Sequence, residues 1–108
     1  MRIRAYPAVK DVENNSGVGR VIREYETRLT ALGFEYVEKD KDAEIIVSHA
    51  GTYSKPDVLH LHGLYWTADY NATSMEYSAN ATIAEAMRWT YAITVPSNWV
   101  AETIKREF

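Results

Sequence analysis

Apolar residues recur every three or four positions over residues 17–32, which is the spacing of one face of an α-helix. The stripe comprises Val18, Val21, Ile22, Tyr25, Leu29 and Leu32. Gly33 follows directly, at a position where glycine commonly ends a helix. The pattern therefore predicts a helix over residues 17–32.

Five short runs rich in β-branched residues or leucine predict β-strands. They cover residues 2–6, 34–37, 44–49, 57–62 and 91–95. Pro7 stops the first run and Pro96 stops the last, because proline cannot continue a strand ladder. The charged run between residues 38 and 42 reads as a solvated connection.

Two further helices are predicted in the second half of the chain. Residues 74–90 carry a stripe of Met75, Ala79, Ile83, Ala86 and Met87, and a last helix follows Ser97, a natural N-cap, with Val100, Ile104 and Phe108 on one face. Apolar strands alternating with helices indicate an α/β fold: a doubly wound, mostly parallel sheet of about five strands, with helices on both faces.

In such a sheet, ligands bind where the strands end. The glycine-rich segment at residues 16–20 and the loops that begin at His49, His62 and Pro96 all follow predicted strands. We therefore expect these four loops to meet at one edge of the sheet and to form the binding site.

Composition narrows the possible functions. The chain has 108 residues, a formal net charge of −3 and no cysteine. One domain fits this length, the charge does not favour nucleic-acid binding, and thiolate catalysis and disulfides are excluded. The sequence also shows no membrane-spanning run and no signal-peptide core, so we expect a cytoplasmic protein.

The glycine-rich turn at Gly17 and Gly19 leads into a helix, whose first backbone N–H groups can bind an anion. A dinucleotide fingerprint is one alternative, because Glu38 lies roughly 20 residues further on, where a ribose-binding acid would sit. That fingerprint needs a third small residue at position 22, which is Ile22. A plain helix-starting loop is the other alternative, and an anion or sugar contact is the preferred interpretation.

His60 and His62 would point to the same face of a strand. A metal site is one interpretation, if Asp57 or Asp69 supplies a carboxylate. In the other, His60 packs under a helix, while His62 reaches the cleft and exchanges protons or hydrogen bonds with a sugar hydroxyl. Trp66 could stack on a sugar ring or pack in the core.

Four segments, taken in order, resemble the N-terminal domain of family 4 glycosyltransferases. They are residues 16–33, which begin SGVGR and end LG, 42–49 (DAEIIVSH), 58–66 (VLHLHGLYW) and 93–100 (ITVPSNWV). The resemblance spans nearly the whole chain. It implies the Rossmann-like, acceptor-side half of a GT-B enzyme, in which two such domains face each other across a cleft.

The resemblance also implies roles for individual residues. His62 would contact the reacting sugar and is the candidate catalytic residue. Gly17 and Gly19 would lie near the donor phosphates, and Ser97 would open the helix after the fifth strand. The other expected donor- or acceptor-binding residues, which lie in or beside the same loops, are Arg20, His49, Gly63 and Trp66.

The implied reaction is hexosyl transfer from a nucleotide-sugar to a sugar or lipid-linked acceptor with retention of configuration, without a metal or other cofactor. In this family a C-terminal domain holds most of the donor, and nothing after Phe108 supplies it here. We therefore expect weak donor binding and no activity from this half alone. A small nucleotide- or phosphate-binding module and a self-associating interaction domain are the alternative hypotheses.

Overall fold

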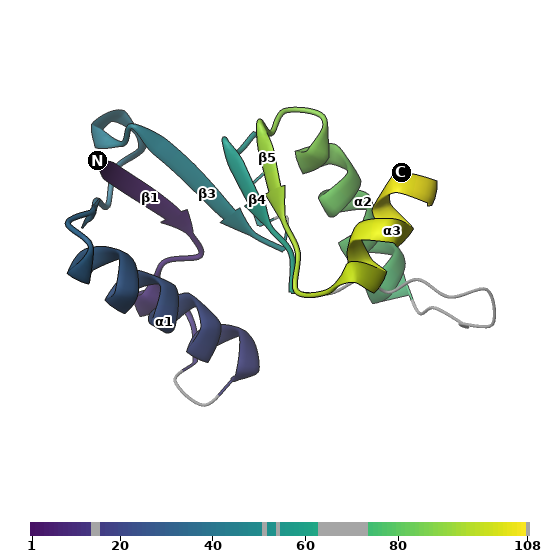
Figure 1. Ribbon diagram of the computed structural model, residues 1–108, viewed down its shortest axis with the longest axis horizontal. Coiled ribbons are helices and arrows are strands. Elements are labelled where there is room, and N and C mark those ends of the chain that lie inside the picture. Colours follow the sequence, from purple (N-terminus) through teal and green to yellow (C-terminus); the bar gives the residue numbers. More distant parts are fainter. Residues whose placement is uncertain (14–15, 51, 54, 63–73, 108) are drawn as a thin grey trace.

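The computed structural model describes residues 1–13, 16–50, 52–53, 55–62 and 74–107 (Figure 1). A five-stranded sheet forms its centre, with every strand parallel to its neighbours, in the order β2-β1-β3-β4-β5. The strands are β1 (Arg2–Tyr6), β2 (Glu35–Tyr36), β3 (Ile45–His49), β4 (Val58–His60) and β5 (Ala92–Thr94). The predicted α/β fold with a parallel sheet is confirmed.

The first helix, α1 (Gly17–Ala31), begins and ends as its sequence predicts. The Ser16 hydroxyl oxygen accepts a hydrogen bond from the backbone N–H of Gly19 at 2.9 Å, which caps the first turn. At the other end Gly33 has a φ of +98°, and the N–H groups of Gly33 and Phe34 donate to the carbonyls of Thr30 and Leu29. This pair of bonds is the Schellman motif, which explains why glycine ends the helix.

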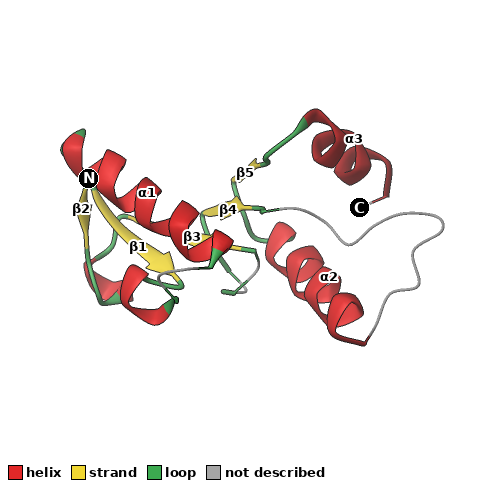
Figure 2. Cartoon of the chain, turned by 90° about the horizontal axis from the view of Figure 1, so that it is seen from below, coloured by secondary structure: helices red, strands yellow, loops and turns green. Residues whose placement is uncertain are grey.

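The helices cover both faces of the sheet (Figure 2). Tyr25 of α1 contacts the ring of His60, while Leu59, the preceding residue of β4, packs with Ile83 and Val100 on the other face. Ile83 belongs to α2 (Ser74–Met87) and Val100 to α3 (Asn98–Glu107). Since neighbouring residues of a strand point to opposite faces, the sheet is doubly wound, as predicted.

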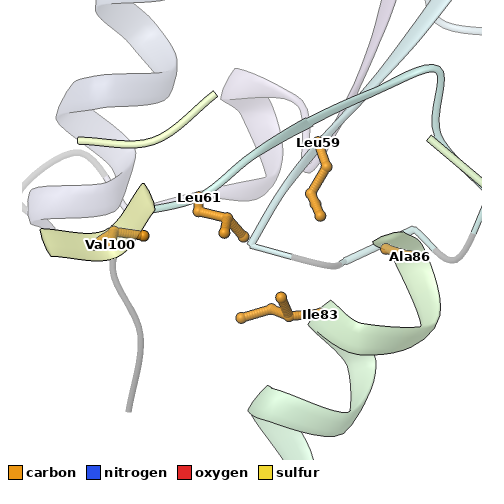
Figure 3. Packing of buried hydrophobic residues seen from close by; sticks show 5 residues of the cluster. All are labelled: Leu59, Leu61, Ile83, Ala86 and Val100. Carbon is orange, nitrogen blue, oxygen red and sulfur yellow. The ribbon is translucent and has the colours of Figure 1, made fainter. Parts of the chain in front are cut away.

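The main hydrophobic cluster lies between β4 and the two C-terminal helices (Figure 3). Its members are Leu59, Leu61, Ile83, Ala86 and Val100, with Met87, Val95 and Ile104 packed against them. The predicted stripes of the second and third helices therefore supply much of this core. Met75 and Phe108, which the sequence placed in the same stripes, lie outside the residues whose side chains the structure describes.

The stripe on α1 is less buried than its spacing predicts. Ile22 is 2% exposed, but Leu32 is 75% exposed and Val18 and Tyr25 are also exposed. One helix covers only part of this sheet face, so several apolar residues of α1 remain in contact with solvent.

Most predicted elements are shorter than expected, by one to three residues, and the fourth strand and the second helix differ clearly from their predicted ranges. The fourth strand ends at His60. Leu61 still donates its N–H to the Thr94 carbonyl. The second helix ends at Met87, and Trp89 donates its N–H back to the Ala86 carbonyl in a closing turn. Within the described part of the chain, no helix is long and apolar enough to cross a membrane.

Candidate functional site

Three histidines gather at the carboxyl edge of the sheet. His49 and His60 are the last residues of the neighbouring strands β3 and β4, and they are paired in register. His62 follows two residues after His60, so its side chain returns to the same face. The parallel register thus brings together residues that are up to 13 positions apart in the sequence.

The three imidazoles are in mutual contact. The ring centres lie 5.5 Å apart for His49 and His60, 5.3 Å for His49 and His62, and 5.0 Å for His60 and His62. The Nδ1 atom of His49 lies 3.1 Å from the Nε2 atom of His62, which is a hydrogen bond with one of the two nitrogens protonated. One ring nitrogen from each residue lies within 4.8 Å of the other two.

Two residues from other elements frame this histidine cluster. The hydroxyl of Thr94, at the end of β5, forms a 2.5 Å hydrogen bond with Nδ1 of His60. Tyr25 of α1 packs edge-on against His60, with ring centres 4.8 Å apart. His49, His60, Thr94 and Tyr25 also line a cavity of about 130 Å³, whose remaining walls are apolar. The cluster therefore lies between the sheet and α1, with its polar atoms at the strand ends.

Burial keeps the histidines neutral. It lowers the pKa of His49 to about 4, with further lowering from the neighbouring charges that His62 and His60 would carry. The pKa values of His60 and His62 are also lowered, mainly by burial. At neutral pH each ring therefore offers a lone pair on one nitrogen and a proton on the other.

The turn after β3 fixes the position of His49, which is only 3% exposed. Ala50 adopts a left-handed backbone with φ of 56° and donates its N–H to the His60 carbonyl at 2.8 Å. The Thr52 hydroxyl lies within hydrogen-bonding distance of the Tyr6 and His49 carbonyls. These contacts attach the end of β3 to both of its neighbouring strands, so the backbone beneath the cluster is held from two sides.

The glycine-rich turn at the start of α1 lies at the same edge of the sheet (Figure 1). Gly17 is exposed, and a Cβ built on it would meet nothing within 4 Å. Gly19 is buried instead, and its Cβ would lie 2.2 Å from the Glu13 carbonyl oxygen. The close approach of the preceding loop thus explains why position 19 needs a glycine. Gly17 and Arg20 are exposed and open to a ligand.

Ser97 performs the capping role that its position predicts. Its hydroxyl oxygen accepts a hydrogen bond from the backbone N–H of Val100 at 3.3 Å, at the start of α3. The residue itself is exposed and follows β5, so it belongs to the same edge. Gly63 and Trp66, the other expected ligand-binding residues, lie outside the described residues.

Asp57, one of the two carboxylates considered for a metal site, is not near the histidines. Asp57 precedes β4, at the opposite edge of the sheet, and its Oδ2 accepts a hydrogen bond from the Ile46 N–H at 2.8 Å. Asp69 lies outside the described residues. The third imidazole comes from His49, which the sequence placed at the same edge as His62 but not in a metal site with His60 and His62. The sequence did contain a signal for this cluster, because two strands predicted to be parallel each have a histidine at or near the carboxyl end.

Glu38, the alternative ribose-binding acid, lies beyond β2 on a different part of the molecule. Its carboxylate is 3.5 Å from the ammonium group of Lys10. Both residues line a cleft of about 340 Å³ with Arg4, Val9 and Tyr36. The dinucleotide hypothesis therefore rests on a different cleft, which has Tyr36 in common with the cavity beside the histidines.

Comparison of the chain with protein-family models, curated proteins and solved structures found no match.

Proposed function

We propose that this chain is the acceptor-side half of a retaining glycosyltransferase and that the carboxyl edge of its sheet contacts the sugar of a nucleotide-sugar donor. The observation that carries the proposal is the position of His62. It lies at the edge of the sheet where α1 begins and on the sheet face that α1 covers, in contact with His49 and His60.

The strand order supports this location. Going from β1, the chain adds β2 on one side of the sheet and β3 on the other, so the order reverses between β1 and β3. In open parallel sheets the crevice outside such a reversal is the usual ligand site. The turn that starts α1 follows β1, and His49 ends β3, so both border this crevice.

The two sides of this crevice, one at His62 and the other at the start of α1, suit different parts of a nucleotide-sugar. A neutral imidazole at His62 can exchange hydrogen bonds with a sugar hydroxyl. The exposed Gly17 leaves the first backbone N–H groups of α1 open to an anion such as a phosphate. Since most of the donor would be held by a second domain, the affinity of this half by itself is weak.

Binding can be tested by titrating the isotope-labelled chain with UDP-glucose and GDP-mannose, observed by NMR. The proposal expects millimolar affinity, with amide shifts confined to residues 16–20, 48–50 and 60–62. His62→Ala should abolish the shifts around position 62, and Glu38→Ala, in the separate cleft, should leave them unchanged. Three results would contradict the proposal. They are shifts centred on Glu38, no shifts at 20 mM ligand (on the order of the weakest expected binding), and sugar transfer by this chain alone.

A second function, binding of a nucleotide as a separate module, is favoured by one observation. The cleft of about 340 Å³ contains Glu38 at the end of β2, where a carboxylate can accept hydrogen bonds from both ribose hydroxyls. Micromolar binding of NAD measured by calorimetry, lost in Glu38→Ala but kept in His62→Ala, would support this function over the first. Equal loss in both variants would contradict it.

A further inference from the structure

We propose that His49, His60 and His62 together bind one divalent transition-metal ion of the zinc class at the carboxyl edge of the sheet. The inference does not rest on the proposed sugar transfer, because it concerns only the contacts among these three side chains. Within the described residues they form a group of three imidazoles with no carboxylate among them.

The separations of the ring nitrogens are close to those that a metal requires. Zinc bonds of 2.0–2.1 Å in a tetrahedron place two ligand nitrogens about 3.3 Å apart. The Nδ1 of His49 and the Nε2 of His62 are already 3.1 Å apart. The three donor atoms lie within 4.8 Å of one another, so the widest gap would close by about 1.5 Å through small ring rotations.

The sheet provides the rigidity that such a site needs. His49 and His60 end strands paired by hydrogen bonds, and the turn at Ala50 bonds directly to the His60 carbonyl. Two of the three ligands are therefore held on hydrogen-bonded backbone at the ends of paired strands. Little conformational entropy remains to be lost when a metal binds.

Thr94 supplies the outer contact that metal-binding histidines usually have. A ligating imidazole uses one nitrogen for the metal and gives the N–H of the other to an oxygen nearby. The Nδ1 of His60 lies 2.5 Å from the Thr94 hydroxyl, which leaves its Nε2 for a metal. Thr94 is thus a positioning residue, acting through His60.

Metal binding requires one proton to move within the cluster. Ligating histidines must be neutral, and a metal competes with protons for each ring. The hydrogen bond between Nδ1 of His49 and Nε2 of His62 holds a proton on one of these two atoms, so that ring has to carry its proton on its other nitrogen before both atoms can bind the ion. Three neutral ligands leave the ion its full charge and one open tetrahedral position, which would favour water or an anionic oxygen.

Cobalt and zinc titrations of the untagged, EDTA-treated full chain test the proposal. At pH 7.5 we expect one Co²⁺ per chain, visible bands of a tetrahedral ion, displacement of Co²⁺ by Zn²⁺, and no binding of Mg²⁺, which prefers oxygen ligands. His62→Ala and His60→Ala should each weaken Zn²⁺ binding by at least about tenfold. Glu38→Gln, an exposed residue in the other cleft, is the matched control and should bind Zn²⁺ as the wild type does.

Circular dichroism checks that each variant is folded, and His62 is the safer test because it lies beyond the end of β4. Absence of Co²⁺ bands and of Zn²⁺ heat in the wild-type chain would overturn the proposal, and would mean that the three histidines form only a hydrogen-bonded network. Unchanged Zn²⁺ affinity in the two folded histidine variants would overturn it as well. Neither result would alter the NMR test for nucleotide-sugars.

Discussion

His49 and His62 share a hydrogen bond of 3.1 Å between Nδ1 of the first ring and Nε2 of the second. The bond joins the last residue of β3 to the segment that follows β4, and His60 contacts both rings. A buried bond of this kind needs one neutral partner with a free lone pair, so the protonation state of the pair matters for stability as well as for ligands.

Stability of the metal-free chain should fall as pH decreases from 7.5 to 4.5. His49 has a pKa of about 4 when folded and about 6.5 when unfolded, so the unfolded chain binds more protons between these values. Its contribution is complete above pH 6.5 and is lost as pH falls towards 4, with a maximum of about 3 kcal/mol. Urea unfolding in EDTA at several pH values measures this loss.

His49→Gln removes the group with the largest shift and should make the pH profile less steep over the same range. The profile should not become flat, because burial also lowers the pKa values of His60 and His62. Tyr25, His60 and His62 face His49 and remain in this variant. A profile as steep as that of the wild type would assign the pH dependence to other groups.

Thr94→Val should change the state of His60 without unfolding the sheet. Valine fits a strand position but cannot bond to Nδ1, so the ring loses the contact that fixes its proton. We expect altered ¹⁵N shifts of the His60 ring and Zn²⁺ affinity lower by about tenfold or more. Thr94→Ser keeps the hydroxyl and should restore both properties, whereas equal behaviour of the two variants would show that the bond has no role.

Gly19→Ala should destabilise the domain, and Gly17→Ala should not. An alanine Cβ at Gly19 would lie 2.2 Å from the Glu13 carbonyl oxygen, so the backbone has to move, at a cost of about 2 kcal/mol. At Gly17 the same atom meets nothing within 4 Å, and alanine should be neutral or stabilising by up to about 1 kcal/mol. Thermal unfolding of the two variants side by side gives the comparison, and equal stabilities would contradict it.

Two copies of the chain should associate through the outer edge of β5 at high concentration. Among the described residues no strand pairs with the outer edge of β5, and Tyr91 and Ile93 are 90% and 37% exposed there. Ile93→Lys should reduce the association seen by sedimentation. Leu32→Lys, directly after the end of α1, changes an equally apolar and more exposed residue and should not. A monomer at millimolar concentration (an affinity weaker than about −4 kcal/mol) would exclude this interface.

The self-associating domain considered from the sequence could use the apolar face predicted for the last helix, which bears Val100, Ile104 and Phe108. The structure corrects this for Val100, which is buried against Leu59 and Leu61 in the main cluster. Among the described residues Val100 and Ile104 pack within the same chain, so the predicted association is assigned to the edge of β5.

Local chemistry allowed much of the fold to be predicted from the sequence. The spacing of Ile22 and its neighbours, the Ser97 cap and the glycine at position 33 each act within a few residues, so the pattern alone locates α1 and the start of α3. Alternation of apolar strands with helices was sufficient for the parallel, doubly wound sheet. These features depend on backbone geometry and local side chains, which the sequence specifies directly.

Register and burial, by contrast, were decided by the tertiary structure. Parity placed His60 and His62 on one face, and the predicted loops placed His49 at the same edge. Only the pairing of β3 with β4 put the rings in contact and left Asp57 at the far edge. Only packing showed that the Glu13 backbone occupies the space where a side chain at position 19 would lie, and that Leu32 stays exposed to solvent. Contacts between distant segments depend on how strands align and how much of a face a helix covers, and no short-range pattern encodes either.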